Sequence, residues 1–447
     1  MTDEDEDIDR GIRGRKWDLE DWWYKPAHVC QRWRNLILGS PSFLGLHLVC
    51  KISTPVADML AYSPPFPLVI NYLYRNHKIQ VYEEDEEGIL LALEQHNRIR
   101  CIRVRLPLRV LQKFVMAIDH ELPSLEYLLM VMTEEDGDTL VFPERIQAPH
   151  LHYLGLEDVV PPIGSRLLTT AVGLVTLCLF MNDSFNYLYP NILLQWISPL
   201  SRLETLEITA YPDADDDVET LLSHTPTITH ATLPNLRLLS FRGFSTYLEV
   251  LVLHIATPRL ERLRVVLFER FPIPIPCLVQ FMNTTELSFD SIKFGFSREQ
   301  VCVETYPNEE NRRCSFSITV DYWDANGRIA PIVDALGQVF VFSAVEHLIL
   351  DYVGDGLSSV QVFDDEAVRT EWHKLLRPFS KVKKLRVNHG LVEQFLRFLR
   401  LEDGELPLEL LPELQELTYS GNSNPGDVFT SFTDARRNAD HLVSSRF

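Results

Sequence analysis

A short hydrophobic pattern recurs along the chain: an apolar residue, two variable residues, a second apolar residue, one variable residue and a third apolar residue. It is clear at residues 125–130, Leu-Glu-Tyr-Leu-Leu-Met, and at residues 203–208, Leu-Glu-Thr-Leu-Glu-Ile. Successive side chains of a strand point to opposite faces, so the second and third apolar positions share one face. The pattern therefore predicts short strands that each bury one face.

Copies of this pattern are separated by 23 to 37 residues, mostly near the period of 20–29 that is typical of leucine-rich repeats. The copies begin at Ile99, Leu125, Leu151, Leu174, Leu203, Leu236, Leu260, Thr284, Ser315, Val345, Val382 and Leu414. Weaker copies begin at Phe43 and Pro67. Amphipathic helical spacing lies between copies, as at residues 108–118.

These features predict an α/β leucine-rich-repeat solenoid over residues 43–421, with a curved parallel sheet and a short helical segment capping its N-terminal end. Five leucines are expected to stack in the core of one parallel sheet: Leu154, Leu177, Leu206, Leu239 and Leu263. An ordinary α/β domain with leucine in its strands is the alternative. Residues 1–16 and 422–447 are interpreted as tails, the first of them disordered.

The capping segment, residues 17–42, contains an apolar stripe at helical spacing. Val29, Trp33, Leu36 and Ile37 recur at i, i+4, i+7 and i+8, which is one face of a helix. Trp33 is expected to be buried against the first repeat, near residues 43–46.

The run Val29-Cys30-Gln31-Arg32-Trp33-Arg34, followed by Ser40-Pro41-Ser42-Phe43-Leu44, resembles the second half of an F-box. The first half, a Leu-Pro-x-Glu stretch, has no counterpart upstream of Val29.

An F-box followed by irregular leucine-rich repeats resembles the large F-box family of mushroom-forming fungi. The resemblance implies a non-enzymatic substrate-recognition subunit of a cullin–RING (SCF-type) ubiquitin ligase. It assigns binding of the small adaptor subunit of these ligases to Val29, Cys30, Trp33, Leu36 and Ile37. A repeat scaffold for protein interaction, with no ligase link, is the alternative.

The net charge indicates which classes of binding partner are favoured. Lys and Arg total 42 and Asp and Glu total 63, a net charge of −21, which disfavours nucleic acid and anionic lipid and favours a basic target protein. Acidic runs at residues 83–87, 134–138, 213–217 and 364–366 are expected in loops that form one acidic rim.

No apolar run is long enough to span a bilayer, the first residues are acidic, and the seven cysteines form no CxxC pair. We therefore expect a cytoplasmic or nuclear protein without a membrane span.

No phosphate-binding loop, dinucleotide fingerprint, zinc-protease motif or nucleophile elbow occurs, so we expect no enzyme activity, cofactor or metal. A target protein is expected on the variable strand positions, which point away from the core. The side chains expected there are Tyr127, Leu129, Tyr153 and Phe180, as an exposed apolar patch, and Arg262 and Arg264. The alternative is that a neighbouring loop covers the apolar patch.

Overall fold

The computed structural model describes residue 25 and residues 29–39, 46–73, 81–133, 140, 142–162, 164–181, 188–210, 230–268, 275–285, 289–297, 300–307, 314–321, 344–352, 372–388, 410–420, 432–434, 436–438 and 443–446. The predicted tail at residues 1–16 lies outside this part of the chain. The chain divides into two compact units, residues 1–174 and 175–447.

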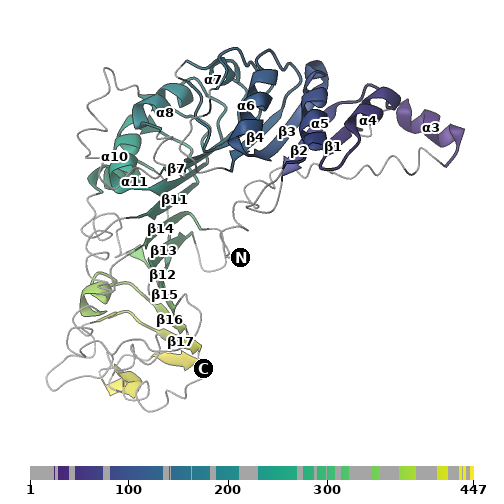
Figure 1. Ribbon diagram of the computed structural model, residues 1–447. Coiled ribbons are helices and arrows are strands. Elements are labelled where there is room, and N and C mark those ends of the chain that lie inside the picture. The colour runs from purple at the N-terminus through teal and green to yellow at the C-terminus, as the bar shows by residue number, and fades with distance from the viewer. Residues whose placement is uncertain are drawn as a thin grey trace. The chain divides into compact units, whose positions relative to one another are not determined.

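The first unit contains a parallel sheet in the order β1-β2-β3-β4-β5, with helices in the connections (Figure 1). Its strands are β1 (Leu48–Lys51), β2 (Leu68–Leu73), β3 (Ile99–Leu106), β4 (Tyr127–Met132) and β5 (Tyr153–Glu157). Its helices are α3 (Gln31–Leu38), α4 (Val56–Tyr62), α5 (Glu83–Leu93), α6 (Leu108–Ala117) and α7 (Arg166–Thr170), with a 3₁₀ turn at His96–Arg98. The pairing aligns Ile70, Ile102, Leu128 and Leu154, which are all fully buried.

The second unit continues the same pattern and carries most of the strands. These are β6 (Thr176–Met181), β7 (Thr205–Ala210), β9 (Leu238–Gly243), β11 (Arg262–Leu267), β12 (Ser291–Phe296), β13 (Gln300–Tyr306), β14 (Phe316–Asp321), β15 (His347–Tyr352), β16 (Lys384–Asn388), β17 (Glu416–Ser420) and β18 (Ser444–Arg446). A separate pair is formed by β8 (Ala231–Thr232) and β10 (Ile255–Ala256). The helices are α8 (Pro190–Ile197), α10 (Ser245–His254) and α11 (Pro276–Thr284).

The recurring pattern predicted most of the strands correctly. Most of these strands begin one or two residues after the pattern does and β3 begins with it, whereas β1 begins at Leu48, after the weak copy at Phe43, and β12 begins at Ser291, after the copy at Thr284. Leu154 and the other four predicted core leucines are fully buried. Leu206 pairs directly with Leu177 and Leu239, and Leu239 pairs with Leu263. The chain is therefore an α/β protein with a large, mostly parallel sheet, as expected.

The strand order differs from the prediction between β11 and β15. The sheet runs β11-β14-β13-β12-β15, and β13 is antiparallel to both of its neighbours. The connection from β12 to β13 is a tight turn in which the N–H of Ser297 donates to the carbonyl of Gln300 (2.9 Å). Parallel neighbours need a crossover of a dozen or more residues, so such a short connection forces antiparallel pairing.

Two of the predicted copies therefore need correction. Thr284, the start of one copy, is the last residue of α11, and the next strand begins only at Ser291. The copy at Ser315 does form a strand, β14, but it pairs with β11 and β13 instead of following its predecessor in order. The prediction of a wholly parallel sheet in sequence order was thus wrong here.

The sheet also extends into residues 422–447, which the sequence analysis interpreted as a tail. β18 pairs in parallel with β17. Arg436 is fully buried, and its Nη2 donates to the carbonyl of Leu411 (2.7 Å) while its guanidinium lies over the ring of Phe432. A buried guanidinium is tolerated only when its N–H groups find acceptors, and these carbonyls supply them.

Candidate functional site

The N-terminal helix α3 confirms the helix expected after Val29. Cys30 is its N-cap residue, and the Sγ atom accepts a hydrogen bond from the backbone N–H of Trp33 (3.5 Å). The helix ends at Gly39, whose N–H donates to the carbonyl of Asn35 (2.9 Å). These contacts are local, so both ends of the helix are marked by residues of the segment itself.

The apolar stripe of this segment lies largely in solvent. Val29 is 70% exposed, Trp33 53% and Leu36 60%, whereas Ile37 is only 3% exposed. The expected burial of Trp33 was therefore wrong. An eight-residue helix presents a narrow face, and of the four residues on that face only Ile37 is covered. A cluster of large exposed apolar side chains on one helix is typical of an interaction site.

The outer sheet face is defined here by the strand side chains that point away from the helix-covered core. In the first unit it carries the predicted apolar patch, but Tyr127, Leu129 and Tyr153 are only 6%, 3% and 9% exposed. The rings of Tyr127 and Tyr153 stack at 4.1 Å with 3° between their planes. Leu129 fills the space above Gly155, where a Cβ atom would lie 2.7 Å from its Cδ1 atom. The prediction of an exposed patch here was wrong, because these side chains are packed.

Charged residues flank this packed cluster. Arg103 lies with its guanidinium carbon 6.0 Å from the centre of the Tyr127 ring. Arg105 approaches Glu157 across β4, at 4.0 Å from Nη2 to Oε2. Burial raises the pKa of Glu157, and the Arg105 charge opposes that shift. Arg103 and Arg105 are therefore engaged with neighbours on their own face.

The outer sheet face of the second unit is more open. Phe180 is half-buried on β6, Arg262 is half-buried on β11, and Arg264 on the same strand is exposed. Arg242 on β9 lies over the ring of Phe268, at 5.4 Å from the ring centre. Of the partner-binding residues predicted from sequence, the two arginines of β11 are thus the more accessible ones, whereas Tyr127, Leu129 and Tyr153 are not.

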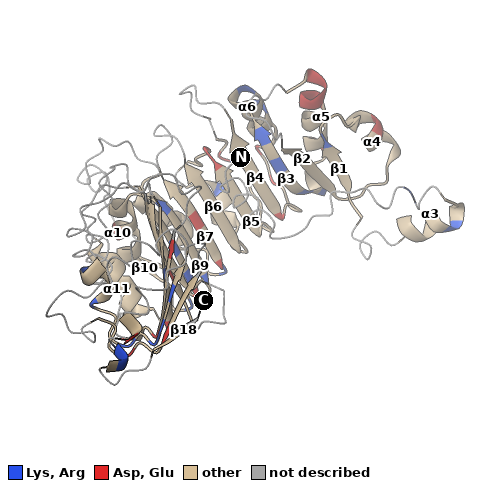
Figure 2. Cartoon of the chain, turned by 90° about the horizontal axis from the view of Figure 1, so that it is seen from below, with Lys and Arg blue, Asp and Glu red and all other residues tan. Residues whose placement is uncertain are grey.

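Charged positions occur on the strands of the second unit (Figure 2). The pairing aligns Glu207 on β7 with Ser240 on β9, and Ser240 with Arg264 on β11, so Glu207 lies on the same face as the arginines. Burial raises the pKa of Glu207, and the charges of Arg264 and Arg262 lower it, so these groups lie within each other's field. No hydrogen bond or ion pair joins the Arg262 or Arg264 side chain to another side chain in the described part of the chain. The sequence analysis missed Glu207, although it occupies the fifth position of the copy at Leu203.

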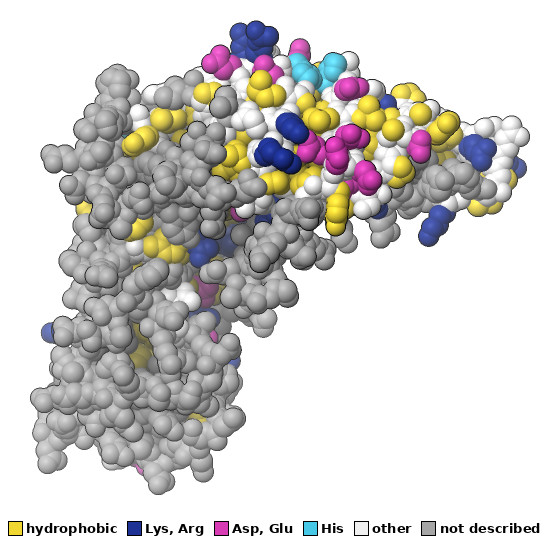
Figure 3. All heavy atoms as spheres, in the orientation of Figure 1, with side chains coloured by type: hydrophobic (Ala, Val, Ile, Leu, Met, Phe, Trp, Pro, Cys, Tyr) yellow, Lys and Arg dark blue, Asp and Glu magenta, His cyan; other side chains and the backbone are white. Residues whose placement is uncertain are grey.

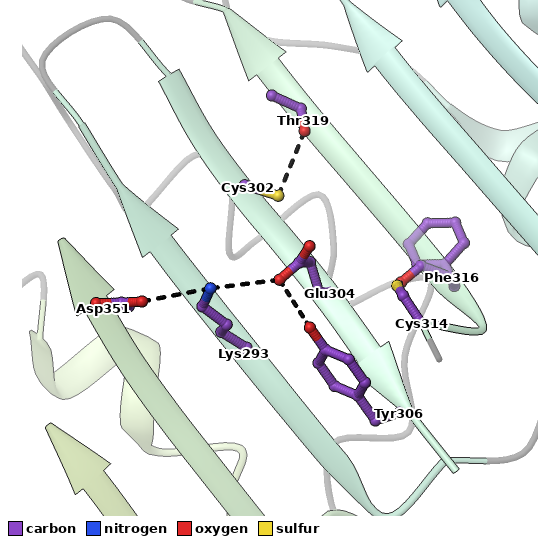
Figure 4. A network of polar contacts seen from close by, with 8 residues as sticks. All are labelled: Lys293, Cys302, Glu304, Tyr306, Cys314, Phe316, Thr319 and Asp351. Atoms are coloured by element: carbon purple, nitrogen blue, oxygen red, sulfur yellow. Dashed lines mark hydrogen bonds and ion pairs between the residues drawn. The ribbon is translucent and has the colours of Figure 1, made fainter. Parts of the chain in front are cut away.

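A polar network lies further along this face, on β12, β13 and β15 (Figure 4). The Nζ atom of Lys293 lies 3.5 Å from Oε2 of Glu304 and 3.3 Å from Oδ2 of Asp351. The hydroxyl of Tyr306 donates to the same Glu304 oxygen (2.9 Å). Burial opposes the Lys293 charge, but the two carboxylates outweigh it and raise the pKa of this amine. The network ties the antiparallel strand β13 to β12, and through Lys293 to β15.

Sequence reasoning missed this network because β13 was not predicted. The signal was present: residues 300–306 alternate polar and apolar side chains, which is typical of a half-buried strand. Near the network, burial raises the pKa values of Cys302 and Cys314 to about 11. Thiols with such pKa values are poor nucleophiles at neutral pH, so they do not favour catalysis.

The acidic run at residues 83–87 does not lie in a loop as expected. It forms the first turns of α5, where Figure 3 shows acidic side chains gathered. Asp85 is buried, and its Oδ1 accepts a hydrogen bond from the N–H of Ser53 (2.7 Å), a residue with a φ of 60°. Acidic side chains favour a helix N-terminus, which explains their position. The other three acidic runs lie outside the described residues.

Further searches of the described residues are negative. They contain no group of three or more His, Cys, Asp or Glu side chains placed to hold a metal ion, and no helix long and apolar enough to cross a membrane. None of the seven cysteines, all of which lie in the described part of the chain, forms a disulfide bond. The chain matches no known family model and no curated protein.

Proposed function

We propose that this chain is a non-enzymatic substrate-recognition subunit of a cullin–RING ubiquitin ligase, with a leucine-rich-repeat solenoid that binds the target protein. In this role α3 contacts the small adaptor subunit, and the outer sheet face contacts the target. The protein performs no chemistry itself, since it holds the target near a ubiquitin-charged enzyme.

The observation that carries the proposal is the exposed apolar face of α3. An apolar side chain stabilises the folded chain when it is buried away from water. No such burial occurs for Val29, Trp33 and Leu36. Val29 and Trp33 also belong to the run in which the sequence resembles an F-box. A binding partner that buries them gains the apolar area that folding left exposed.

The solenoid part of the proposal is supported by the sheet. Strands of nearly constant register repeat at short intervals, and the same position of each contributes a buried leucine, as at Leu177, Leu206 and Leu239. In such an architecture each repeat buries its apolar side against its neighbours. The reversed strand β13 would then be an insertion within the array.

The test is calorimetric titration of the full chain with purified adaptor subunit. A buried interface anchor contributes about 2 kcal/mol or more, so Trp33→Ala and Leu36→Ala should each weaken binding roughly 30-fold. Asn35→Ala is the matched control, because Asn35 is exposed on the same helix and lies off the apolar stripe. Equal affinities for the Trp33 variant and the control would contradict the proposed role of α3.

A second arm uses a chain extended by a Leu-Pro-x-Glu-Ile-Leu segment before residue 17. Since residues 1–28 contain no such segment, the addition should strengthen adaptor binding by roughly 30-fold to 1,000-fold, equivalent to one or two anchors. Failure of both forms to bind would favour the alternative function, a protein-interaction scaffold with no ligase link. The observation that favours this alternative is that residues 17–24 do not match the first half of an F-box.

A further inference from the structure

We propose that the target segment is an acidic peptide in extended conformation, bound by Arg262 and Arg264 on the outer sheet face of the second unit. The inference rests on the proposed function, because it names the chemistry of the target. It reverses the expectation of a basic target, which was drawn from the net charge of −21.

Strand pairing places small polar residues on both sides of Arg264. In the aligned strands, Ser240 on β9 and Ser317 on β14 lie directly opposite it. Neighbouring strands are about 4.8 Å apart, so both serines flank the base of the Arg264 side chain. Serine side chains are too short to cover an arginine, which explains why Arg264 remains exposed. Hydroxyl donors beside a guanidinium are suited to an anionic oxygen.

The spacing of the two arginines indicates the form of the ligand. Arg262 and Arg264 are two residues apart on one face of β11, so their Cα atoms are separated by roughly 6.6 Å. An extended peptide presents its alternate side chains at the same spacing. Two carboxylates at positions i and i+2 can therefore each meet one guanidinium, and a carboxylate can accept two parallel hydrogen bonds from it.

Local charge favours an anion despite the acidity of the whole chain. On β7, β9 and β11 the described outer-face side chains include Arg242, Arg262 and Arg264 and a single carboxylate, Glu207. At the two nearest positions of β14 the pairing brings up Ser317 and Thr319, which are neutral. One strand further, Glu304 on β13 lies opposite Ser317, but its carboxylate is paired with Lys293 at 3.5 Å. Because charge interactions are screened beyond about 8 Å in physiological salt, these local groups outweigh the distant acidic residues.

Glu207 has a specific part in this site. Pairing sets it opposite Ser240, which in turn lies opposite Arg264, so it is two strands from that arginine. A carboxylate that reaches toward the guanidinium across a serine competes with an incoming acidic side chain. Glu207 is therefore expected to weaken the binding of acidic ligands, and its removal should strengthen it.

The experiment is fluorescence anisotropy of the full chain with a labelled peptide that carries Glu-Val-Glu between Gly-Ser flanks. Matched peptides carry Gln-Val-Gln or Lys-Val-Lys. The acidic peptide should bind at least tenfold more tightly than either. Arg262→Gln and Arg264→Gln should each weaken its binding about tenfold or more, and Glu207→Gln should strengthen it several-fold.

Arg109→Gln is the control, because it removes the same charge from an exposed position on helix α6 of the first unit. It should change the affinity less than twofold, and melting temperatures should show that all variants are folded. Equal affinity for the acidic and basic peptides, or arginine variants that match the control, would overturn the proposal. Adaptor titration of the Arg264 variant separates this proposal from the proposed function. If the variant binds the adaptor as the parent does but no longer binds the peptide, both proposals are supported. If the parent chain binds the peptide but not the adaptor, only the acidic-peptide site is supported.

Discussion

Removal of the Glu249 carboxylate should destabilise the packing of α11 on α10. The N-cap residue of helix α11 is Ile275, whose side chain makes no capping hydrogen bond, and the first helical residue, Pro276, has no N–H to donate. The next two backbone N–H groups, of Cys277 and Leu278, both donate to the Glu249 carboxylate, at 2.7 and 2.8 Å. A glutamate of one helix therefore supplies the N-terminal cap of the next.

The magnitude follows from these two bonds. A hydrogen bond to a charged group contributes about 1.5–3 kcal/mol, and loss of an N-cap typically costs about 0.5–2 kcal/mol. The contact is only partly buried, so water can replace part of it in the variant. We therefore expect Glu249→Ala to lower the free energy of unfolding by about 2 kcal/mol. Glu249→Gln should cost about 1 kcal/mol, because its amide oxygen can still accept.

The assay is urea unfolding followed by circular dichroism, with Glu261→Gln as the control. Glu261 forms an exposed ion pair with Arg237, and such pairs contribute about 0–1 kcal/mol. A second readout is alkylation of Cys277, because burial and the Glu249 charge raise the pKa of this thiol. Glu249→Gln should therefore speed its reaction with iodoacetamide near pH 8. An Ala variant as stable as the control, with unchanged alkylation, would refute the reasoning.

Three further predictions follow from burial and charge. Leu206→Ala should lower the free energy of unfolding by about 2–5 kcal/mol in urea titrations, because Leu206 is fully buried between equivalent leucines. Trp33→Ala should change it by less than about 0.5 kcal/mol in the same assay, since Trp33 is exposed. Burial and a neighbouring histidine lower the pKa values of His120 and His254. The unfolded chain then binds protons more readily, so stability should fall as the pH drops below about 6.5, and a His120→Gln, His254→Gln variant should show a flatter dependence of unfolding midpoint on pH.

The strands and much of the core could be predicted from sequence because their signals are local. Alternation of apolar and polar residues indicates which side chains of a strand share a face, and it does so whichever strands the strand pairs with. Leu154, Leu206 and Leu263 are buried for this reason. The helix after Cys30 is equally local, since its cap is made by its own first residues. The arginines of β11 were likewise assigned to the outer face by alternation alone.

Only the tertiary structure decided which strands pair and which surfaces are covered. The order β11-β14-β13-β12 depends on contacts between residues far apart in the chain, and periodicity carries no information on them. The same alternation that put Arg264 on the outer face put Tyr127 there, yet Arg264 is exposed and Tyr127 is stacked on Tyr153. Trp33 shows the converse, an apolar side chain left in solvent. Exposure is a property of what packs against a residue, and that is determined by non-local contacts.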